Sequence, residues 1–142
     1  MSVNFFQADC ETITSAVKFG ICDGENTYPA FLNFDALVEK WIAEVENEEE
    51  IEVIFTAIDN CIDILDENGE TQSRCDAMMR YAENLIFIEL KEVRTDWIKG
   101  GIGQLKETIL YFKANQRVDA YSKKRAFLAN RKHPRFKFRN VK

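Results

Sequence analysis

The sequence predicts a single domain of the α/β (α+β) class, in which a central mixed sheet is flanked by helices. At 142 residues the chain has the length of one domain. Hydrophobic residues make up 46% and aromatic residues 12%, a composition typical of a folded globule and not of a disordered chain. Some segments alternate apolar and polar residues, whereas others repeat apolar residues every three to four positions, so strands and helices are both expected.

The first 33 residues are predicted to form an N-terminal extension that contains a hairpin. Residues 18–22 favour a strand, residues 23–26 are rich in turn formers, and residues 28–32 favour a second strand. This extension precedes a core at residues 34–130 and a basic tail at residues 131–142.

The core is expected to begin with a helix over residues 34–45. Apolar residues there recur at helical spacing, and Asn33 is a candidate N-cap. The members of this stripe are Phe34, Leu37, Val38, Trp41, Ile42 and Val45. The acidic run at residues 46–50 is expected to end the helix in a solvated turn.

Three consecutive strands are expected next. Residues 51–57 alternate, and residues 61–65 favour a short resumption of that strand after a break at 59–60. Residues 74–91 read as a hairpin of two strands about a turn at 82–83. A second helix is predicted from Ile102, Leu105, Ile109 and Phe112, and a last strand from residues 124–130. The predicted core order is therefore helix, three strands, helix, strand.

The hairpin brings like charges together. With a turn at 82–83, paired residue numbers sum to 165, so Asp76 lies opposite Glu89. Like charges directly opposed across two strands destabilise a sheet. Lys91 lies two residues after Glu89 and therefore shares its face. Two acids and a lysine are expected to converge at one strand end, as a candidate site for a divalent metal; the alternative is a structural salt-bridge network that also uses Arg74 or Arg94.

An Asp on one strand, followed by Glu-Leu-Lys at residues 89–91 of the next within an αβββαβ order, resembles the PD-(D/E)XK nuclease superfamily. The resemblance covers residues 34–130, about two-thirds of the chain. Cys75 stands where the family pattern has proline. The resemblance implies a restriction-endonuclease-like fold and a nuclease that hydrolyses phosphodiester bonds with a metal-activated water.

The resemblance also implies roles for individual residues. Asp76, Glu89 and the backbone carbonyl of Leu90 would bind Mg²⁺, with Mn²⁺ as a substitute. Lys91 would orient the attacking water, and Gln104 on the second helix would contact water or phosphate. The implied catalytic set is Asp76, Glu89, Lys91 and Gln104. Asp59 and Asp63, just upstream, are further candidate carboxylates.

Charge is divided unevenly along the chain. Up to Ser73 there are 2 basic and 17 acidic residues, and after it 17 basic and 7 acidic ones, within a net charge of −5. Basic surfaces attract phosphate backbones, so nucleic acid, with DNA as the expected form, is the predicted partner. The predicted contacts are Arg74, Lys123, Lys124, Arg125, Arg131 and Lys132. The alternatives are a solvated tail or neutralisation by the acidic half.

Other classes find little support in the sequence. There is no apolar run of membrane-spanning length and no export leader, so a cytoplasmic chain is expected. The gaps between Cys10, Cys22, Cys61 and Cys75 contain no CxxC pair, and reduced structural thiols are predicted. The single histidine, His133, makes a zinc finger or a histidine-based triad an unfavourable explanation.

Two other functions remain open at this stage. The chain could be a catalytically inactive nuclease fold that binds nucleic acid or protein. It could also use its acidic half as an inhibitor that mimics DNA or as an immunity-type protein. No separate recognition domain is visible, so a homodimer or a targeting partner protein is expected to direct a nuclease of this size.

Overall fold

The computed structural model describes residues 4–24, 27–34, 40–64, 68–69, 74–91, 97–129 and 135–137. In this part of the chain two sheets and one α-helix, α1 (Trp97–Asn115), form the architecture. The five-stranded sheet has the order β1 (Glu11–Thr14), β5 (Val53–Ala57), β6 (Ala77–Tyr81), β7 (Asn84–Leu90), β8 (Lys123–Ala129). The four-stranded sheet has the order β3 (Phe31–Asn33), β2 (Lys18–Cys22), β4 (Ala43–Glu46), β9 (Arg135–Lys137).

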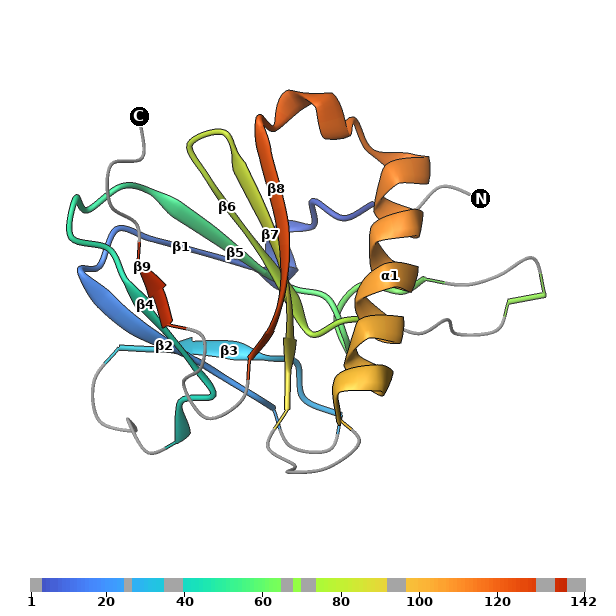
Figure 1. The fold of residues 1–142 in the computed structure, drawn as a ribbon, viewed down its shortest axis with the longest axis horizontal. Coiled ribbons are helices and arrows are strands. Elements are labelled where there is room, and N and C mark those ends of the chain that lie inside the picture. Colours follow the sequence, from blue (N-terminus) through green and yellow to red (C-terminus); the bar gives the residue numbers. More distant parts are fainter. Residues whose placement is uncertain are drawn as a thin grey trace.

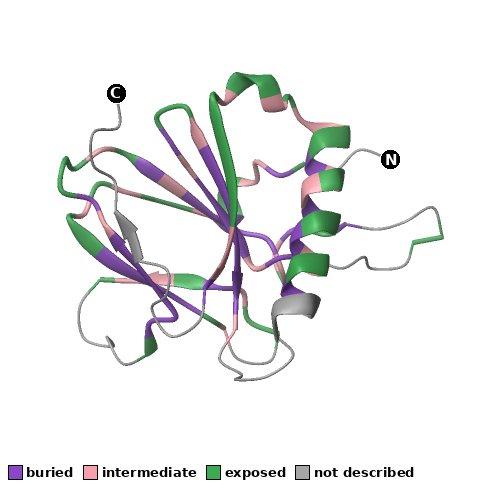
Figure 2. Cartoon of the chain, viewed as in Figure 1, coloured by how far each residue is buried: buried purple, intermediate pink, exposed green. Residues whose placement is uncertain are grey.

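The elements form three layers, with the five-stranded sheet between the four-stranded sheet and α1 (Figure 1). One core fills the space between the two sheets, where Phe19 and Val45 pack with Phe55 and Ile88. A second core lies between the five-stranded sheet and α1, around Phe112. Figure 2 shows the buried residues concentrated along these two contacts. The α/β class and the mixed sheet are therefore confirmed.

The strand β7 lies at the centre of this arrangement. From Leu85 to Leu90 every residue is buried, because one face of the strand meets the other sheet and the opposite face meets α1. A strand buried on both faces reads as an unbroken apolar run. β6 pairs with β7 antiparallel, whereas β8 returns through α1 and pairs with β7 parallel. Parallel neighbours need such a crossover, commonly a helix.

The hairpin prediction is confirmed in its register. Tyr81 pairs with Asn84 and Ala77 with Ile88, so the paired numbers sum to 165. The turn places Ala82 at a φ of 48°, a left-handed conformation that glycine or asparagine adopts more readily. The Asn84 side-chain amide donates to the Tyr81 carbonyl at 3.3 Å and helps to close this turn.

The N-terminal hairpin, the strand at 51–57, the second helix and the last strand are also present. β2 and β3 pair antiparallel, β5 covers residues 53–57, and β8 begins at Lys123. The helix α1 begins at Trp97, five residues before the first position of the predicted apolar stripe. Among the described residues, no helix combines the length and apolar character of a membrane span.

The predicted helix over residues 34–45 is wrong at its C-terminal end. Residues 43–46 form β4, which pairs antiparallel with β2 and parallel with β9. Ala43 and Val45 enter the core between the sheets and alternate with Glu44 and Glu46, but four alternating residues are too few to outweigh the longer helical stripe. Residues 35–39 lie outside the described part of the chain. The short strand expected at 61–65 is also wrong where it is described, because residues 61–62 form a turn.

The two sheets do not follow the predicted division into extension, core and tail. β1, from the first 33 residues, is the edge strand beside β5, and β9, from the expected basic tail, pairs with β4. In that pairing Arg135 lies opposite Glu44 and Lys137 opposite Glu46. Part of the basic C-terminal segment is thus aligned with an acidic strand of the first half.

The prediction of four reduced cysteines is wrong for one pair. Cys10 and Cys61 form a disulfide across a sequence separation of 51 residues, whereas Cys22 and Cys75 are free and buried. The disulfide depends on the pairing of two distant strands. Glu11 of β1 pairs with Thr56 of β5, and this brings Cys10, just before β1, to the turn after β5 that contains Cys61. The spacing of the cysteines in the sequence does not indicate this pair.

Reduction of this disulfide is expected to lower the free energy of unfolding by about 2–4 kcal/mol, because the cross-link restricts the unfolded chain. Urea unfolding with and without a phosphine reductant measures the change. A Cys10→Ser variant is the control, since it should show the lower stability and no further response to reductant. Equal stability of the wild-type protein with and without reductant would contradict the expectation.

Candidate functional site

Two acidic side chains meet where β6 begins and β7 ends. Asp76 stands one step beyond the last ladder pair, Ala77 with Ile88, and Glu89 follows Ile88 within β7. Glu89 Oε1 accepts a hydrogen bond from the backbone N–H of Asp76 at 3.1 Å, and Asp76 Oδ2 accepts one from the backbone N–H of Leu90 at 2.7 Å. The two acids lie opposite each other, as expected, and each accepts a hydrogen bond from the backbone of the other's strand.

Lys91 supplies the positive charge that the opposed acids require. Its Nζ lies 3.0 Å from Glu89 Oε2, and its side chain is 28% exposed against 1% for Glu89. The strand alternation puts the two side chains on one face, as expected. The backbone N–H of Lys91 donates to the Ala129 carbonyl at 2.9 Å, which fixes the end of β7 against β8.

Burial raises the pKa of both carboxyl groups. For Asp76, burial and then the charge of Glu89 raise the pKa from 3.8 to about 8, against the opposing hydrogen bond from Leu90. For Glu89, burial again raises the pKa, while contacts with Lys91 and Asp76 lower it. At neutral pH the raised pKa of Asp76 favours the protonated form of its carboxyl group.

The two residues that precede Asp76 are held by hydrogen bonds to α1. Cys75 donates its backbone N–H to Thr108 Oγ1 at 2.6 Å, and Thr108 in turn donates to the Gln104 carbonyl at 2.8 Å. Gln104 Nε2 donates to the Arg74 carbonyl at 3.3 Å. On the other side, the Asp76 carbonyl accepts from the Ile58 N–H at 2.8 Å. Gln104, implied as catalytic, thus has a positioning contact in this structure.

A Thr108→Val substitution is expected to destabilise the protein by about 1–3 kcal/mol, because it leaves the buried N–H of Cys75 without its acceptor. Urea unfolding measures the loss, and hydrogen exchange at the Cys75 amide reports it locally. Thr108→Ser is the matched variant, since it keeps the hydroxyl and should lose less. Equal stability of the valine and serine variants would show that the hydrogen bond contributes nothing.

The guanidinium of Arg74, expected to bind nucleic acid, is already engaged. It pairs with Asp59 at 3.2 Å, approaches Asp63 at 3.9 Å and donates to the Ile62 carbonyl at 3.1 Å. Asp59 also lies close enough for its charge to raise the pKa of Asp76. Arg74 therefore connects the turn after β5 to the site, and its role in nucleic-acid binding stays a prediction.

The cations of β8 do not gather at the acids. Lys123, Lys124 and Arg125 are exposed but pair with residues 84–86, at the start of β7. Leu128 is the partner of Glu89, so Lys123 lies five residues, about 16 Å, away along the strand. The ammonium of Lys124 donates to the Val118 and Tyr121 carbonyls at 3.3 and 3.0 Å. Arg131 and Lys132 follow the nearer end of β8 and lie outside the described residues.

The helix covers the site closely because it carries a glycine there. A Cβ on Gly101 would lie 2.2 Å from Leu128 Cδ2 and 3.5 Å from Glu89 Cγ. The lack of a side chain at Gly101 therefore lets α1 pass directly over Glu89 and its β8 partner. The sequence did not indicate this role of Gly101 or the contact of Thr108, whereas Asp59, expected as a further carboxylate, does lie close enough to act on Asp76. The Gly-Gly pair at 100–101 was the available signal for a close approach.

The donor set suits a hard divalent cation. Mg²⁺ takes oxygen ligands, commonly one or two carboxylates completed by water and substrate phosphate. Asp76 and Glu89 supply one partly buried and one buried carboxyl group, and burial raises the pKa of both because it disfavours their negative charges. A divalent cation between them would compensate those charges. Within the residues that the structure describes, no group of three or more His, Cys, Asp or Glu side chains could hold a metal. The remaining ligands would be a backbone carbonyl, water or substrate.

Comparison of the chain with protein-family models, with curated proteins and with solved structures found no match.

Proposed function

We propose that the protein is a metal-dependent nuclease that hydrolyses phosphodiester bonds, with DNA as the expected substrate. The observation that carries the proposal is the convergence of Asp76, Glu89 and Lys91 at the junction of β6 and β7. Their contacts, at 2.7–3.1 Å, join two strands at one point. A structural ion pair needs only one acid, whereas the second buried carboxyl group raises the cost of the arrangement.

The order of elements around the acids also supports a PD-(D/E)XK type of core. β5, β6 and β7 are consecutive antiparallel neighbours, and α1 then leads to β8, parallel to β7. The acids occupy the second and third strands of this series, and Gln104 and Thr108 come from the helix that follows. This is the strand, strand, strand, helix, strand part of the proposed order.

Each residue of the site has a proposed role. Asp76 and Glu89 would hold Mg²⁺, together with the Leu90 carbonyl. The bound ion would lower the pKa of a coordinated water and polarise the phosphoryl oxygen. Lys91 Nζ, anchored to Glu89 Oε2, can donate hydrogen bonds to the attacking water and to the phosphate. Thr108 and Gln104 fix residues 74–75 and so set the position of Asp76.

The proposal is tested by incubating plasmid DNA and a single-stranded RNA with the protein and Mg²⁺, Mn²⁺ or EDTA. Cleavage is expected with either metal and not with EDTA, and an Asp76→Ala variant is expected to be inactive. Asp119→Ala is the matched control, because its carboxylate is exposed beyond the C-terminal end of α1, far from the acids, and pairs with Arg117.

Cleavage by the Asp76→Ala variant, or cleavage that EDTA does not stop, would contradict the proposal. A wild-type protein that binds DNA without metal and turns over no substrate with any divalent ion would instead indicate a catalytically inactive binding module of the same fold.

A further inference from the structure

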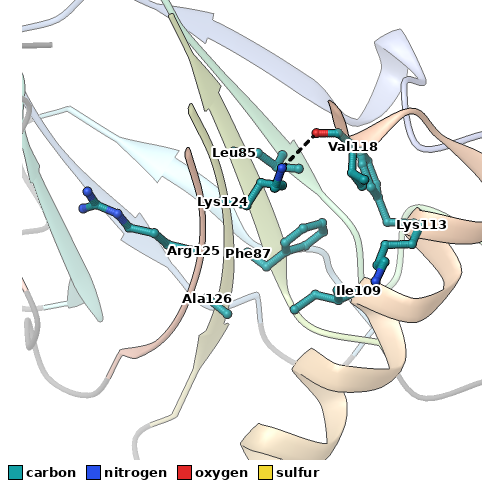
Figure 3. A pocket seen from close by; sticks show the side chains of 9 residues that line it. Leu85, Phe87, Ile109, Lys113, Val118, Lys124, Arg125 and Ala126 are labelled. Atoms are coloured by element: carbon teal, nitrogen blue, oxygen red, sulfur yellow. Dashed lines mark hydrogen bonds between the residues drawn. The ribbon is translucent and has the colours of Figure 1, made fainter. Parts of the chain in front are cut away.

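A second concave site lies on the helix side of the five-stranded sheet, at the end opposite to the acids. The pocket has a volume of about 390 Å³, in the range of small-molecule sites. Figure 3 shows it between α1 and the β7 and β8 strands. Its lining consists of Leu85, Phe87, Ile109, Phe112, Lys113, Val118, Lys124, Arg125 and Ala126.

The hollow has a cause in the sequence. β8 places Lys124 opposite Leu85 and Ala126 opposite Phe87, and these pairs face α1. Ala126 is too small to reach the helix, and it remains exposed although Phe87 beside it is buried. Lys124 directs its ammonium to the carbonyls of the turn after α1, at the edge of the pocket, as the dashed contact in Figure 3 shows for Val118. Nothing in the described chain fills the space that remains.

The walls and the rim have different chemistry. The floor is apolar: Phe87 and Phe112 are in edge contact, with ring centroids 5.3 Å apart, and Ile109 lies beside them. Two ammonium groups, those of Lys113 and Lys124, stand at the rim, and no acidic residue lines the pocket. Arg125 lines the edge but extends away from the pocket in Figure 3, as strand alternation requires.

We propose that this pocket binds small amphiphilic carboxylates, with the apolar body against Ile109, Val118 and Ala126 and the carboxylate between Lys113 and Lys124. The two protons that Lys124 donates go to neutral carbonyls, so its charge is not matched by an acid there. A carboxylate at the rim supplies that charge, and an apolar chain of several carbons removes the exposed apolar surface of Ile109, Val118 and Ala126 from water. This site is independent of the proposed nuclease site.

The test uses octanoate as the probe, with 1-octanol and octylamine as matched ligands of the same chain length. Titration is followed by amide shifts in two-dimensional NMR of the full chain. Octanoate is expected to saturate, to shift the amides of Phe87, Ile109 and Ala126, and to bind about tenfold more tightly than 1-octanol. Octylamine is expected to bind more weakly than either.

Two variants locate the site. Ala126→Leu fills the hollow and is expected to abolish octanoate binding, whereas Ala114→Leu, at an exposed position of α1 outside the pocket, is its control. Lys113→Gln is expected to weaken octanoate about threefold and leave 1-octanol unchanged. Lys106→Gln, also exposed on α1 and outside the pocket, is the control for that charge.

Equal affinity for octanoate and 1-octanol would overturn the assignment of a carboxylate. Unsaturable shifts, or octanoate binding that survives Ala126→Leu, would overturn the site itself. If Ala126→Leu does not fold, the comparison of Lys113→Gln with Lys106→Gln decides the matter, because only the rim lysine is expected to alter octanoate affinity.

Discussion

Replacing Lys91 by methionine is expected to lower the rate of metal-dependent DNA cleavage by about 10²–10³-fold, the usual cost of removing one donor from a developing charge. Methionine keeps the length and most of the packing of the side chain. What it removes is the Nζ that lies 3.0 Å from Glu89 Oε2 and that can reach the attacking water. Because Lys91 would act on the transition state, kcat is expected to fall and KM to change little.

A matched substitution separates this effect from a general loss of charge. Lys106→Met removes a lysine that is exposed on α1, and its cleavage rate is expected to equal that of the wild-type protein. Circular dichroism and urea unfolding of both variants show whether the fold survives. A Lys91→Met protein that stays folded and cleaves within a few-fold of the wild-type rate would remove Lys91 from the chemistry.

The hairpin that carries the acids could be predicted because its information is local. The apolar run of β7 is long, the turn at 82–83 sets the register, and the register alone decides which residues face each other. Once Asp76 was placed opposite Glu89, electrostatics required a cation, and Lys91 was the one on the correct face. The positions of Asp76, Glu89 and Lys91 were therefore accessible without any tertiary information.

The failure at residues 34–45 has a different origin. The spacing of Trp41, Ile42 and Val45 suits a helical stripe, yet these residues are buried as part of the four-stranded sheet or beside it. The strand β4 does alternate apolar and polar residues, but only over four positions, so the apolar stripe that begins at residue 34 outweighs it in the sequence. What decides the conformation is the presence of β2 and β9 on either side, and β9 comes from residue 135 onward.

The supports of the site were hidden for the same reason. The spacing of Gln104 and Thr108 puts them on one face of a helix. Only the packing of α1 shows that Thr108 is fully buried and accepts a hydrogen bond from the Cys75 backbone. The pairing of Cys10 with Cys61 likewise depends on β1 joining the sheet beside β5. Local sequence pointed to the acids and the lysine, whereas the contacts with α1 and the disulfide are made across 30 residues or more.

The stability of the metal-free protein is expected to fall as the pH rises from 5 to 8. Burial, and next the charge of Glu89, raise the pKa of Asp76 from 3.8 to about 8. Between those two values the folded protein keeps a proton that the unfolded chain has released. The unfolded state then binds fewer protons, so the free energy of unfolding decreases with pH, by up to about 4 kcal/mol over three pH units.

Urea unfolding at pH 5, 6, 7 and 8 in the presence of EDTA measures this slope. An Asp76→Asn variant is the control: it cannot ionise at residue 76, so its stability should depend less on pH and should exceed that of the wild-type protein at pH 8. A wild-type stability that is constant or rises across this range would show that the carboxyl group of Asp76 is ionised in the folded protein.

Mg²⁺ is expected to oppose this trend, because a divalent ion binds the deprotonated pair and competes with the proton. At ten times its dissociation constant, an ion that binds only the folded state adds about 1.4 kcal/mol to the free energy of unfolding. The gain is expected to be larger at pH 8 than at pH 5 and to be absent from the Asp76→Asn variant. A gain of equal size in both proteins would place the bound ion elsewhere, whereas its loss in the variant alone would tie the proton and the metal to the same two carboxyl groups.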